Sequence, residues 1–258
     1  MVNAIQELGA KTTRFIEELG RIAGFTWLIV RAVFRPPPRI RPFIDEVFKV
    51  GVMSLVIICV SGVAVGAVLG LQGYNTLVRF GATESLGAAV GLVLFRELGP
   101  VLTALLFIGR AGSSTTAEIG TMVATEQLDG LRMMAVDPIH YVITPKALAM
   151  LFVMPLLSSL FILFGLGGGY LVGAQLMGVD PGSYISSLQN AIVFKDDILS
   201  SLIKALTFGC MVGVISTFEG YSSAPTSSGV SRATTASVVV GSVSVLIVDY
   251  LLTALMGV

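Results

Sequence analysis

Apolar residues run along this chain in five stretches that are long enough to cross a membrane. About 20 predominantly apolar residues of helix span the hydrocarbon core of a bilayer. The stretches are residues 50–71, 85–108, a span within the uncharged run 147–179, residues 198–218 and residues 236–258. The third run exceeds one straight span, so part of it must tilt, bend or emerge from the bilayer. The pattern predicts an all-α polytopic membrane protein with five transmembrane helices.

The segment before the first span follows a different pattern. Residues 4–23 alternate apolar and charged positions with helical period, which indicates an amphipathic helix at a membrane surface or against a partner. Residues 24–34 are apolar but too few to span, so we expect a flat or re-entrant interfacial segment. Residues 35–42 form a basic, proline-rich connector that cannot continue a helix. We therefore expect a single domain, 1–258, with interfacial helices and connector in 1–46 and a transmembrane bundle in 47–258.

Composition agrees with a membrane location and excludes several function classes. Only 12% of the residues are charged and the mean hydropathy is +0.89, whereas soluble domains average about 25% charged residues. The net charge of zero gives no global field that would attract nucleic acid. One histidine and two cysteines in apolar stretches do not make a metal cluster. Because GxxxxGK[ST] is absent, the chain has no P-loop of its own to bind ATP. We expect it to bind no cofactor itself.

Basic residues are distributed unevenly between the two sides of the predicted bundle. Eight lysines and arginines precede the first span, whereas the loop that follows it carries only Arg79. The excess of basic residues marks the cytoplasmic side, so we expect a cytoplasmic N-terminus and, after five spans, a periplasmic C-terminus. An odd number of spans argues against an inverted repeat within one chain, so two-fold symmetry would require a dimer.

Four charged residues lie inside the predicted spans. A charge at bilayer depth costs at least ~2.5–3.5 kcal/mol, and such residues usually face a bundle interior or a water-filled cavity. The four are Arg96, Glu97, Lys204 and Asp249. Helix rise places the first two near the midplane and the last two in the outer half, where they can pair. Either all four are ion pairs that fix helix register, or at least one lines a substrate headgroup site or a conformational switch; we favour the second interpretation.

Three glycines form a stripe on the first span. Gly62, Gly66 and Gly70 recur at four-residue spacing, and small residues at this spacing let another helix approach closely. We interpret the stripe as helix packing within the chain, with a seam between two copies as the alternative.

The connection between spans two and three, residues 109–145, is the longest hydrophilic loop. Thr115 and Thr116 followed by Glu118 predict the start of a helix, and Asp137 before Pro138 predicts its end. The helix would mix acidic and methionine-rich positions, which favours docking to a protein over an ordinary solvated loop. By the same reasoning Thr144 would cap span three, and Thr234 or Thr235 would cap span five.

Four segments of the chain resemble the MlaE family. They are GLQGY (70–74), RELGPVLTALLFIGRAGSSTTAEIGTM (96–122), ATEQLDGLRMMAVDP (124–138) and PTSSGVSRATT (225–235). Members of this family are permease subunits of bacterial ABC transporters that work with MCE-domain lipid-binding proteins. The motifs are long, and the resemblance covers nearly the whole chain.

The resemblance implies a set of partners. The chain would act as a homodimer in the bacterial inner membrane, with ATP and Mg on a cytoplasmic ABC ATPase (MlaF-like). A small STAS-domain protein (MlaB-like) and a hexameric periplasmic MCE protein (MlaD-like) would complete the complex. Its function would be to move glycerophospholipids between the inner membrane and the MCE carrier and so maintain outer-membrane lipid asymmetry. No catalytic residues are expected.

The resemblance also assigns roles to residues. The family's coupling helix, which docks into the ATPase, matches the surroundings of Glu126, Gln127 and Asp129. The candidate coupling residues are Glu118, Glu126, Gln127, Asp129, Arg132 and Asp137. The dimer would enclose an outward-opening cavity, and Leu69, Tyr74 and Phe80 are the expected acyl-chain contacts.

Two other function classes remain as alternatives. An ion-coupled secondary transporter could use Glu97 or Asp249 as a proton site and would work without an ATPase. An intramembrane enzyme is disfavoured, because no nucleophile–base pair or paired-carboxylate motif falls on one face. A stable partnership with an ATPase would distinguish the leading interpretation from both.

Overall fold

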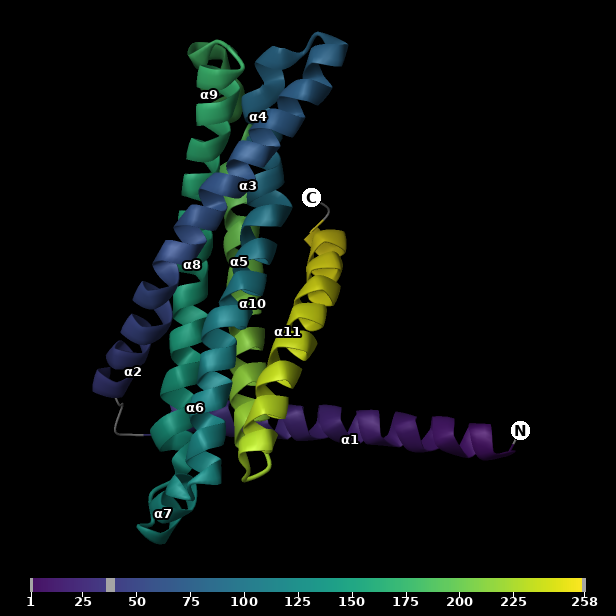
Figure 1. Ribbon diagram of the computed structural model, residues 1–258, viewed down its shortest axis with the longest axis vertical. Helices are drawn as coiled ribbons and strands as arrows, with labels where there is room; N and C mark the ends of the chain where they lie inside the picture. Colours follow the sequence, from purple (N-terminus) through teal and green to yellow (C-terminus); the bar gives the residue numbers. More distant parts are fainter. Residues whose placement is uncertain (1, 36–39, 257–258) are drawn as a thin grey trace.

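The computed structural model describes residues 2–35 and 40–256, and all regular structure in those ranges is helical. Five helices are long and apolar enough to cross a membrane: Ile40–Phe80, Thr83–Ala124, Ile139–Leu176, Phe194–Tyr221 and Ser227–Met256. They run along one another as a tall bundle, and the N-terminal helix projects across one end (Figure 1). The predicted fold class, an all-α polytopic membrane protein, is confirmed.

Most spans are built from several helical segments that join without a break. Helices α1 (Val2–Val33) and α2 (Ile40–Val47) precede the π-helical turn η1 (Phe48–Val52) and α3 (Met53–Leu77), and 3₁₀ turns η2 (Val78–Phe80) and η3 (Thr83–Ser85) follow. Span two begins with η3 and continues through α4 (Leu86–Val93), η4 (Leu94–Leu98), α5 (Gly99–Phe107), η5 (Ile108–Gly112) and α6 (Ser113–Ala124). After α7 (Gln127–Met133), span three comprises η6 (Ile139–Ile143), α8 (Thr144–Tyr170) and η7 (Leu171–Leu176). The remaining elements are α9 (Pro181–Ala191), η8 (Phe194–Ile198), α10 (Leu199–Tyr221) and α11 (Ser227–Met256).

The N-terminal segment is one helix and contains no re-entrant turn. Helix α1 runs unbroken to Val33 and lies across the end of the bundle where α7 is found (Figure 1). Phe25 packs on Phe218 and Tyr221 of α10, whereas Trp27 is exposed. The re-entrant alternative for residues 24–34 is therefore wrong, because nothing in that stretch interrupts helical hydrogen bonding.

Part of the predicted connector is helical. Residues 36–39 lie outside the described residues, but α2 already begins at Ile40 and contains Pro42. A proline in the first turn of a helix costs little, since its missing N–H has no intrahelical partner there.

Three predicted helix boundaries are wrong. Thr115 and Thr116 start no helix, because span two continues through them to the end of α6. Span three begins at Ile139, whose N–H donates to the Asp137 carboxylate, and not at Thr144. Span five begins at Ser227 with the Thr226 hydroxyl accepting from the Gly229 N–H, well before Thr234 and Thr235. In each case helical bonding continues through residues that can also serve as caps.

Helix α9 was not anticipated. It follows span three, and the Asp180 carboxylate caps it by accepting from the Ser183 N–H. Its Tyr184 is buried against Tyr170, and burial raises the pKa of Tyr184 to about 12.

The glycine stripe of span one lies against span three of the same chain. A Cβ on Gly62 would come within 2.7 Å of the Phe161 carbonyl oxygen, and one on Gly70 within 2.9 Å of the Gly169 carbonyl oxygen. At Gly66 a Cβ would overlap the carbonyl of Gly165. The stripe is therefore used inside the chain, and this face of α3 is not free to form a seam between two copies.

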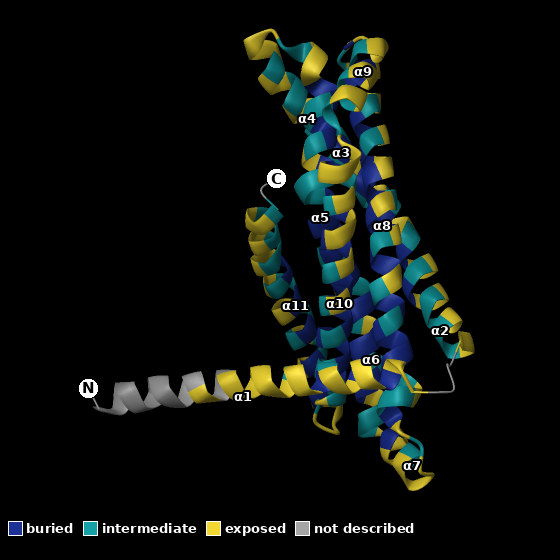
Figure 2. Cartoon of the chain, turned by 180° about the vertical axis from the view of Figure 1, so that it is seen from behind, coloured by how far each residue is buried: buried dark blue, intermediate teal, exposed yellow. Residues whose placement is uncertain are grey.

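Spans one and five are the most open to the outside. Of their most apolar 18-residue windows, 22% and 11% are buried, compared with 44–50% for the other three spans. Figure 2 shows buried positions concentrated along α5, α8 and α10, with exposed and half-buried positions along α11. The core therefore lies between spans two, three and four, and span five covers only one side of it.

Candidate functional site

A proline in span two leaves a backbone carbonyl free to bind a cation. Arg96 and Glu97 lie in the π-helical turn η4, and Pro100 follows four residues after Arg96. Proline has no N–H, so it cannot donate to the carbonyl four residues before it. The Arg96 carbonyl instead accepts a 2.7 Å hydrogen bond from Nζ of Lys204 in α10.

Lys204 is the centre of a polar cluster between spans two, four and five. Its side chain is 2% exposed, and Nζ lies 3.2 Å from Glu97 Oε1 and 3.3 Å from Asp249 Oδ1. Nζ also donates to the Thr253 hydroxyl at 2.7 Å. The predicted pairing of Lys204 with Asp249 is thus present, and Glu97 belongs to the same group. Thr253 was not anticipated, although it lies one helical turn after Asp249 on the same face.

Arg96 pairs with a residue that sequence reasoning missed. Its Nε lies 2.7 Å from Oδ1 of Asp197, which is fully buried in η8. The other carboxylate oxygen of Asp197 accepts from the Val193 N–H at 2.7 Å. Asp197 lies in the charged run Lys195-Asp196-Asp197, which is typical of a solvated loop. Only its contact with Arg96, 101 positions earlier in the chain, shows that Asp197 is buried and paired.

The cluster is closed on one side and open on the other. Lys204 and Asp197 are enclosed, but the Glu97 side chain is 40% exposed at the centre of a membrane span. A carboxylate that faces hydrocarbon is strongly disfavoured. This face therefore requires a polar environment that the single chain does not provide.

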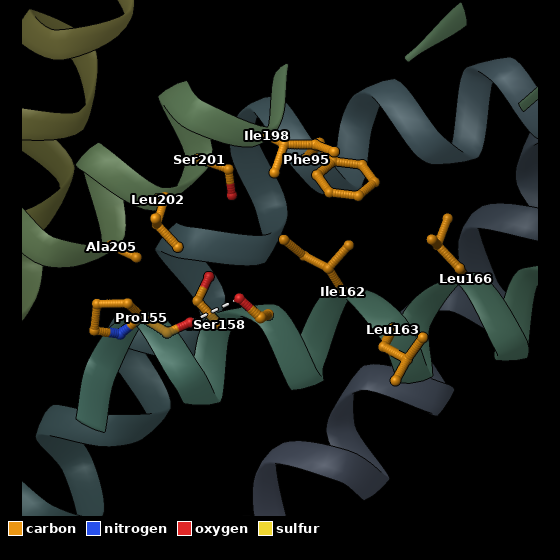
Figure 3. Close-up of a pocket in the computed structure, with 11 residues that line it drawn as sticks. Phe95, Pro155, Ser158, Ile162, Leu163, Leu166, Ile198, Ser201, Leu202 and Ala205 are labelled. Carbon is orange, nitrogen blue, oxygen red and sulfur yellow. Dashed lines mark hydrogen bonds between the residues drawn. The ribbon is translucent and has the colours of Figure 1, made fainter. Parts of the chain in front are cut away.

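A cavity lies beside the cluster, between α8 and the start of α10. Its volume is about 230 Å³, and Phe95 and Ile198, the neighbours of Arg96 and Asp197, both line it. Figure 3 shows Ser158 and Ser201 among apolar side chains on its walls. Small-molecule sites usually measure about 300–1,000 Å³. The cavity is therefore too small for a whole phospholipid.

The residues expected to contact acyl chains lie at the end of the molecule opposite α7. Leu69 and Tyr74 of α3 are half-buried and pack against the core, whereas Phe80 of η2 is exposed. Only Phe80 among them presents a freely accessible apolar side chain in one copy of the chain.

Helix α7 forms the tip of the molecule at the end where α1 lies (Figure 1). Leu128 is buried and anchors it, whereas Glu126, Gln127 and Asp129 are exposed. Met133 and Met134 beside them are exposed too. The helix therefore offers a short acidic and thioether-rich surface to a partner.

The other candidate coupling residues do not share this surface. Arg132 is held by Asp129 and by the Tyr221 hydroxyl at the end of α10, and these two groups, Tyr221 first, raise the pKa of Arg132. Asp137 pairs with Arg35 at 3.2 Å at the end of α1. Glu118 lies inside α6, before the break that leads into α7, and pairs with Lys146 of α8 at 2.8 Å. The expectation of one continuous helix carrying Glu118 and Asp129 is therefore wrong, because Glu126 adopts a left-handed conformation that separates α6 from α7.

The amino-acid sequence of the chain matches proteins of known family. Residues 43–255 match the family described as Permease MlaE. The chain is 50% identical over 259 residues to the intermembrane phospholipid transport system permease protein MlaE of Haemophilus influenzae, across 99% of this chain and 98% of that protein. A probable ABC transporter permease protein of Rickettsia felis is 37% identical over 99% of this chain and 98% of its own length. The chloroplast protein TRIGALACTOSYLDIACYLGLYCEROL 1 of Arabidopsis thaliana is 32% identical over 83% of this chain and 61% of its own length. The chain therefore belongs to the MlaE permease family.

Proposed function

We propose that this chain is the membrane-spanning subunit of an ABC transporter that moves glycerophospholipids between the inner membrane and a periplasmic lipid carrier. The observation that carries the proposal is the half-open charge cluster around Lys204 at the centre of the bundle. A phospholipid has a charged headgroup and apolar tails, so a polar cluster framed by apolar spans matches its chemistry. The similarity to a phospholipid transport permease over almost the whole chain supports the same substrate class.

The working unit in this proposal is a homodimer. The 40% exposure of Glu97 inside a span is compatible with a membrane only if a second copy, water or a headgroup covers it. The weak burial of spans one and five supports the same conclusion, since these helices are available to face another copy. Two copies would enclose a lipid-sized cavity, with Phe80 near its outer end.

The energy source is proposed to be a separate ATPase. Exposed Glu126, Gln127 and Asp129 on α7 would dock into that cytoplasmic subunit, which would hold ATP and Mg. Because α7 lies at the end of the bundle that α1 crosses, and most basic residues precede the first span in the sequence, this end would be cytoplasmic and the C-terminus periplasmic. A STAS-domain protein on the ATPase side and a hexameric MCE protein on the periplasmic side would complete the complex. In this setting the transporter would maintain the lipid asymmetry of the outer membrane.

The test is purification of the tagged chain from its native membranes in mild detergent, followed by mass spectrometry of proteins and lipids. We expect an ATPase, an MCE-domain protein and phospholipid to co-purify. The purified complex, reconstituted into vesicles, should then transfer labelled phospholipid in an ATP-dependent manner. A chain that emerges alone and moves no lipid would contradict the proposal and favour an ion-coupled transporter.

A further inference from the structure

A second buried lysine lies near the end of the bundle that carries α7. The Lys146 side chain, at the start of α8, is 3% exposed. Its Nζ lies 2.8 Å from Glu46 Oε1 of α2 and 2.8 Å from Glu118 Oε2 of α6. One ammonium group thus joins the beginnings of spans one and three to the extension of span two.

A second cation completes the cluster. Lys49 of η1 lies 3.5 Å from Glu46 Oε1 and 3.8 Å from Glu118 Oε1, so each carboxylate is shared by two lysines. Arg110 of η5 donates to the Lys49 carbonyl and to the Ser54 hydroxyl, which ties span two to span one once more. Glu118 is therefore poised between two partners: one at hydrogen-bond distance and one slightly beyond it.

The cluster lies on the route from α7 to the spans. Glu118 is less than two helical turns before α6 ends at Ala124, and α7 begins at Gln127. Helix α6 packs closely on α10 and α11, where the Thr116 hydroxyl bonds the Ser216 carbonyl and the Ser237 hydroxyl. The ion pairs of Glu118 also join α6 to α8 through Lys146 and to η1 of span one through Lys49. A displacement of α7 therefore reaches spans one and three through these charged side chains.

Stability alone does not account for this arrangement. Replacing a buried ion-pair network with apolar or neutral groups of similar size is often neutral or stabilising. Spans one and three are already held together by close backbone contact at Gly62, Gly66 and Gly70. Long charged side chains that each reach two partners at once suit an interface that must shift while its charges stay paired.

We propose that Lys146 is a positioning residue that couples displacement of α7 to spans one and three, with Glu118 moving between Lys146 and Lys49 as α6 shifts. This inference rests on the proposed function, because it assigns a path for the ATP-driven motion. It predicts that loss of the cluster separates ATP hydrolysis from lipid movement while leaving ATPase docking intact.

The test uses the whole complex purified from native membranes, with Glu118→Gln as the first variant. We expect normal co-purification of the ATPase and continued ATP hydrolysis, with the lipid transferred per ATP lowered at least about fivefold. Asp45→Asn is the matched control, because this exposed carboxylate lies on α2 beside Glu46 but outside the ion pairs of the cluster. A ratio of lipid to ATP like that of the wild type in Glu118→Gln would overturn the proposal.

A second variant guards against a simple folding defect. Glu46→Gln, Glu118→Gln and Lys146→Met together remove the buried charges without leaving one unpaired in the interior. We expect this variant to unfold at a temperature close to that of the wild type and still to show the lowered ratio. A wild-type ratio of lipid to ATP in the triple variant would show that the cluster does not transmit motion from α7 to the spans. Loss of ATPase binding in both variants would show the same, because the cluster would then act on docking itself. If the wild-type complex itself moves no lipid, the proposed function fails, which is a separate result.

Discussion

Two buried lysines in this chain are each paired with two carboxylates, but the two groups lie in different surroundings. Lys204 and Lys146 are 2% and 3% exposed, and each binds two carboxylates from two other helices. In each group one carboxylate is largely enclosed and the other is open, with Glu97 40% and Glu118 37% exposed. Glu97, the open carboxylate beside Lys204, lies at the depth of the bilayer interior. Glu118, the open carboxylate beside Lys146, lies toward the end of the bundle that carries α7, next to a second lysine, Lys49. The same ion-pair chemistry can therefore serve a substrate-facing surface in one place and a movable joint in the other.

The largest expected effect comes from removing each lysine in turn. Lys204→Met leaves Glu97 and Asp249 without a cation, since Arg96 is bound to Asp197. Breaking a buried pair in this way costs about 3–5 kcal/mol, so we expect a clearly lower unfolding temperature in detergent. Lys146→Met should cost less, because Lys49 still faces both Glu46 and Glu118.

The control for this pair is Lys195→Met, which changes an exposed lysine near the same end of α10. Its unfolding temperature should stay near that of the wild type. Equal decreases in unfolding temperature for Lys204→Met and Lys146→Met would show that the two clusters contribute equally to stability, which would contradict the expected difference between them.

A smaller loss is expected at the seam between α3 and α8, which lies outside both clusters. The Cβ of Gly66→Ala would overlap the Gly165 carbonyl, so α3 and α8 must move apart. Overpacking of this kind typically costs about 1–3 kcal/mol. Gly167→Ala is the matched control, because its Cβ meets nothing within 4 Å and alanine favours the helix.

Thermal unfolding of the two glycine variants in the same detergent measures this difference. Gly66→Ala should unfold below the wild type and Gly167→Ala at or above it. If the two variants unfold together, the seam is more compliant than the backbone contacts indicate.

The extent to which sequence predicts this molecule differs between the spans and the site. The sequence predicts the five spans and the four charged residues within them. A bilayer requires a minimum length of apolar helix and makes charged residues inside it costly, so both features stand out in the sequence. The pairing of Lys204 with Asp249 followed from helix rise alone. Asp197 and Thr253 were missed, since their roles depend on how η8 and α11 pack on span two.

The boundaries of α6 and α7 were missed for a related reason. Gly109, Gly112 and the serines and threonines after them resemble a loop, but α6 is held as a helix by its contacts with α10 and α11. The break before α7 comes at Glu126, which has a positive φ. A glycine at this position would have indicated such a break in the sequence, but a glutamate does not. Helix α9 was predictable, since Asp180 before Pro181 is a regular N-terminal signal.

The docking surface of α7 gives the next prediction. Glu126→Lys reverses a charge on the exposed side of the turn that leads into α7. We expect less ATPase to co-purify with this variant, because the acidic surface offered to the partner is lost. Glu84→Lys, at the opposite end of span two, is the control and should leave the complex intact. Normal assembly and ATP turnover in Glu126→Lys would show that docking uses another surface.

The final prediction concerns the open carboxylate of the Lys204 cluster. Glu97→Ala leaves Lys204 paired with Asp249 and bonded to Thr253 and the Arg96 carbonyl, so the fold should persist. Lipid transfer should nevertheless fall by about tenfold or more, which corresponds to about 1.4 kcal/mol, because the charge facing outside the chain is removed. Glu118→Gln should lower lipid transfer per ATP by a different route, with the lipid content of the purified complex unchanged. The measurement is bound phospholipid per complex beside transfer rate: Glu97→Ala should lower both. Wild-type lipid content and transfer in Glu97→Ala would mean that the Lys204 cluster, like an ordinary buried ion pair, only fixes the register of the spans.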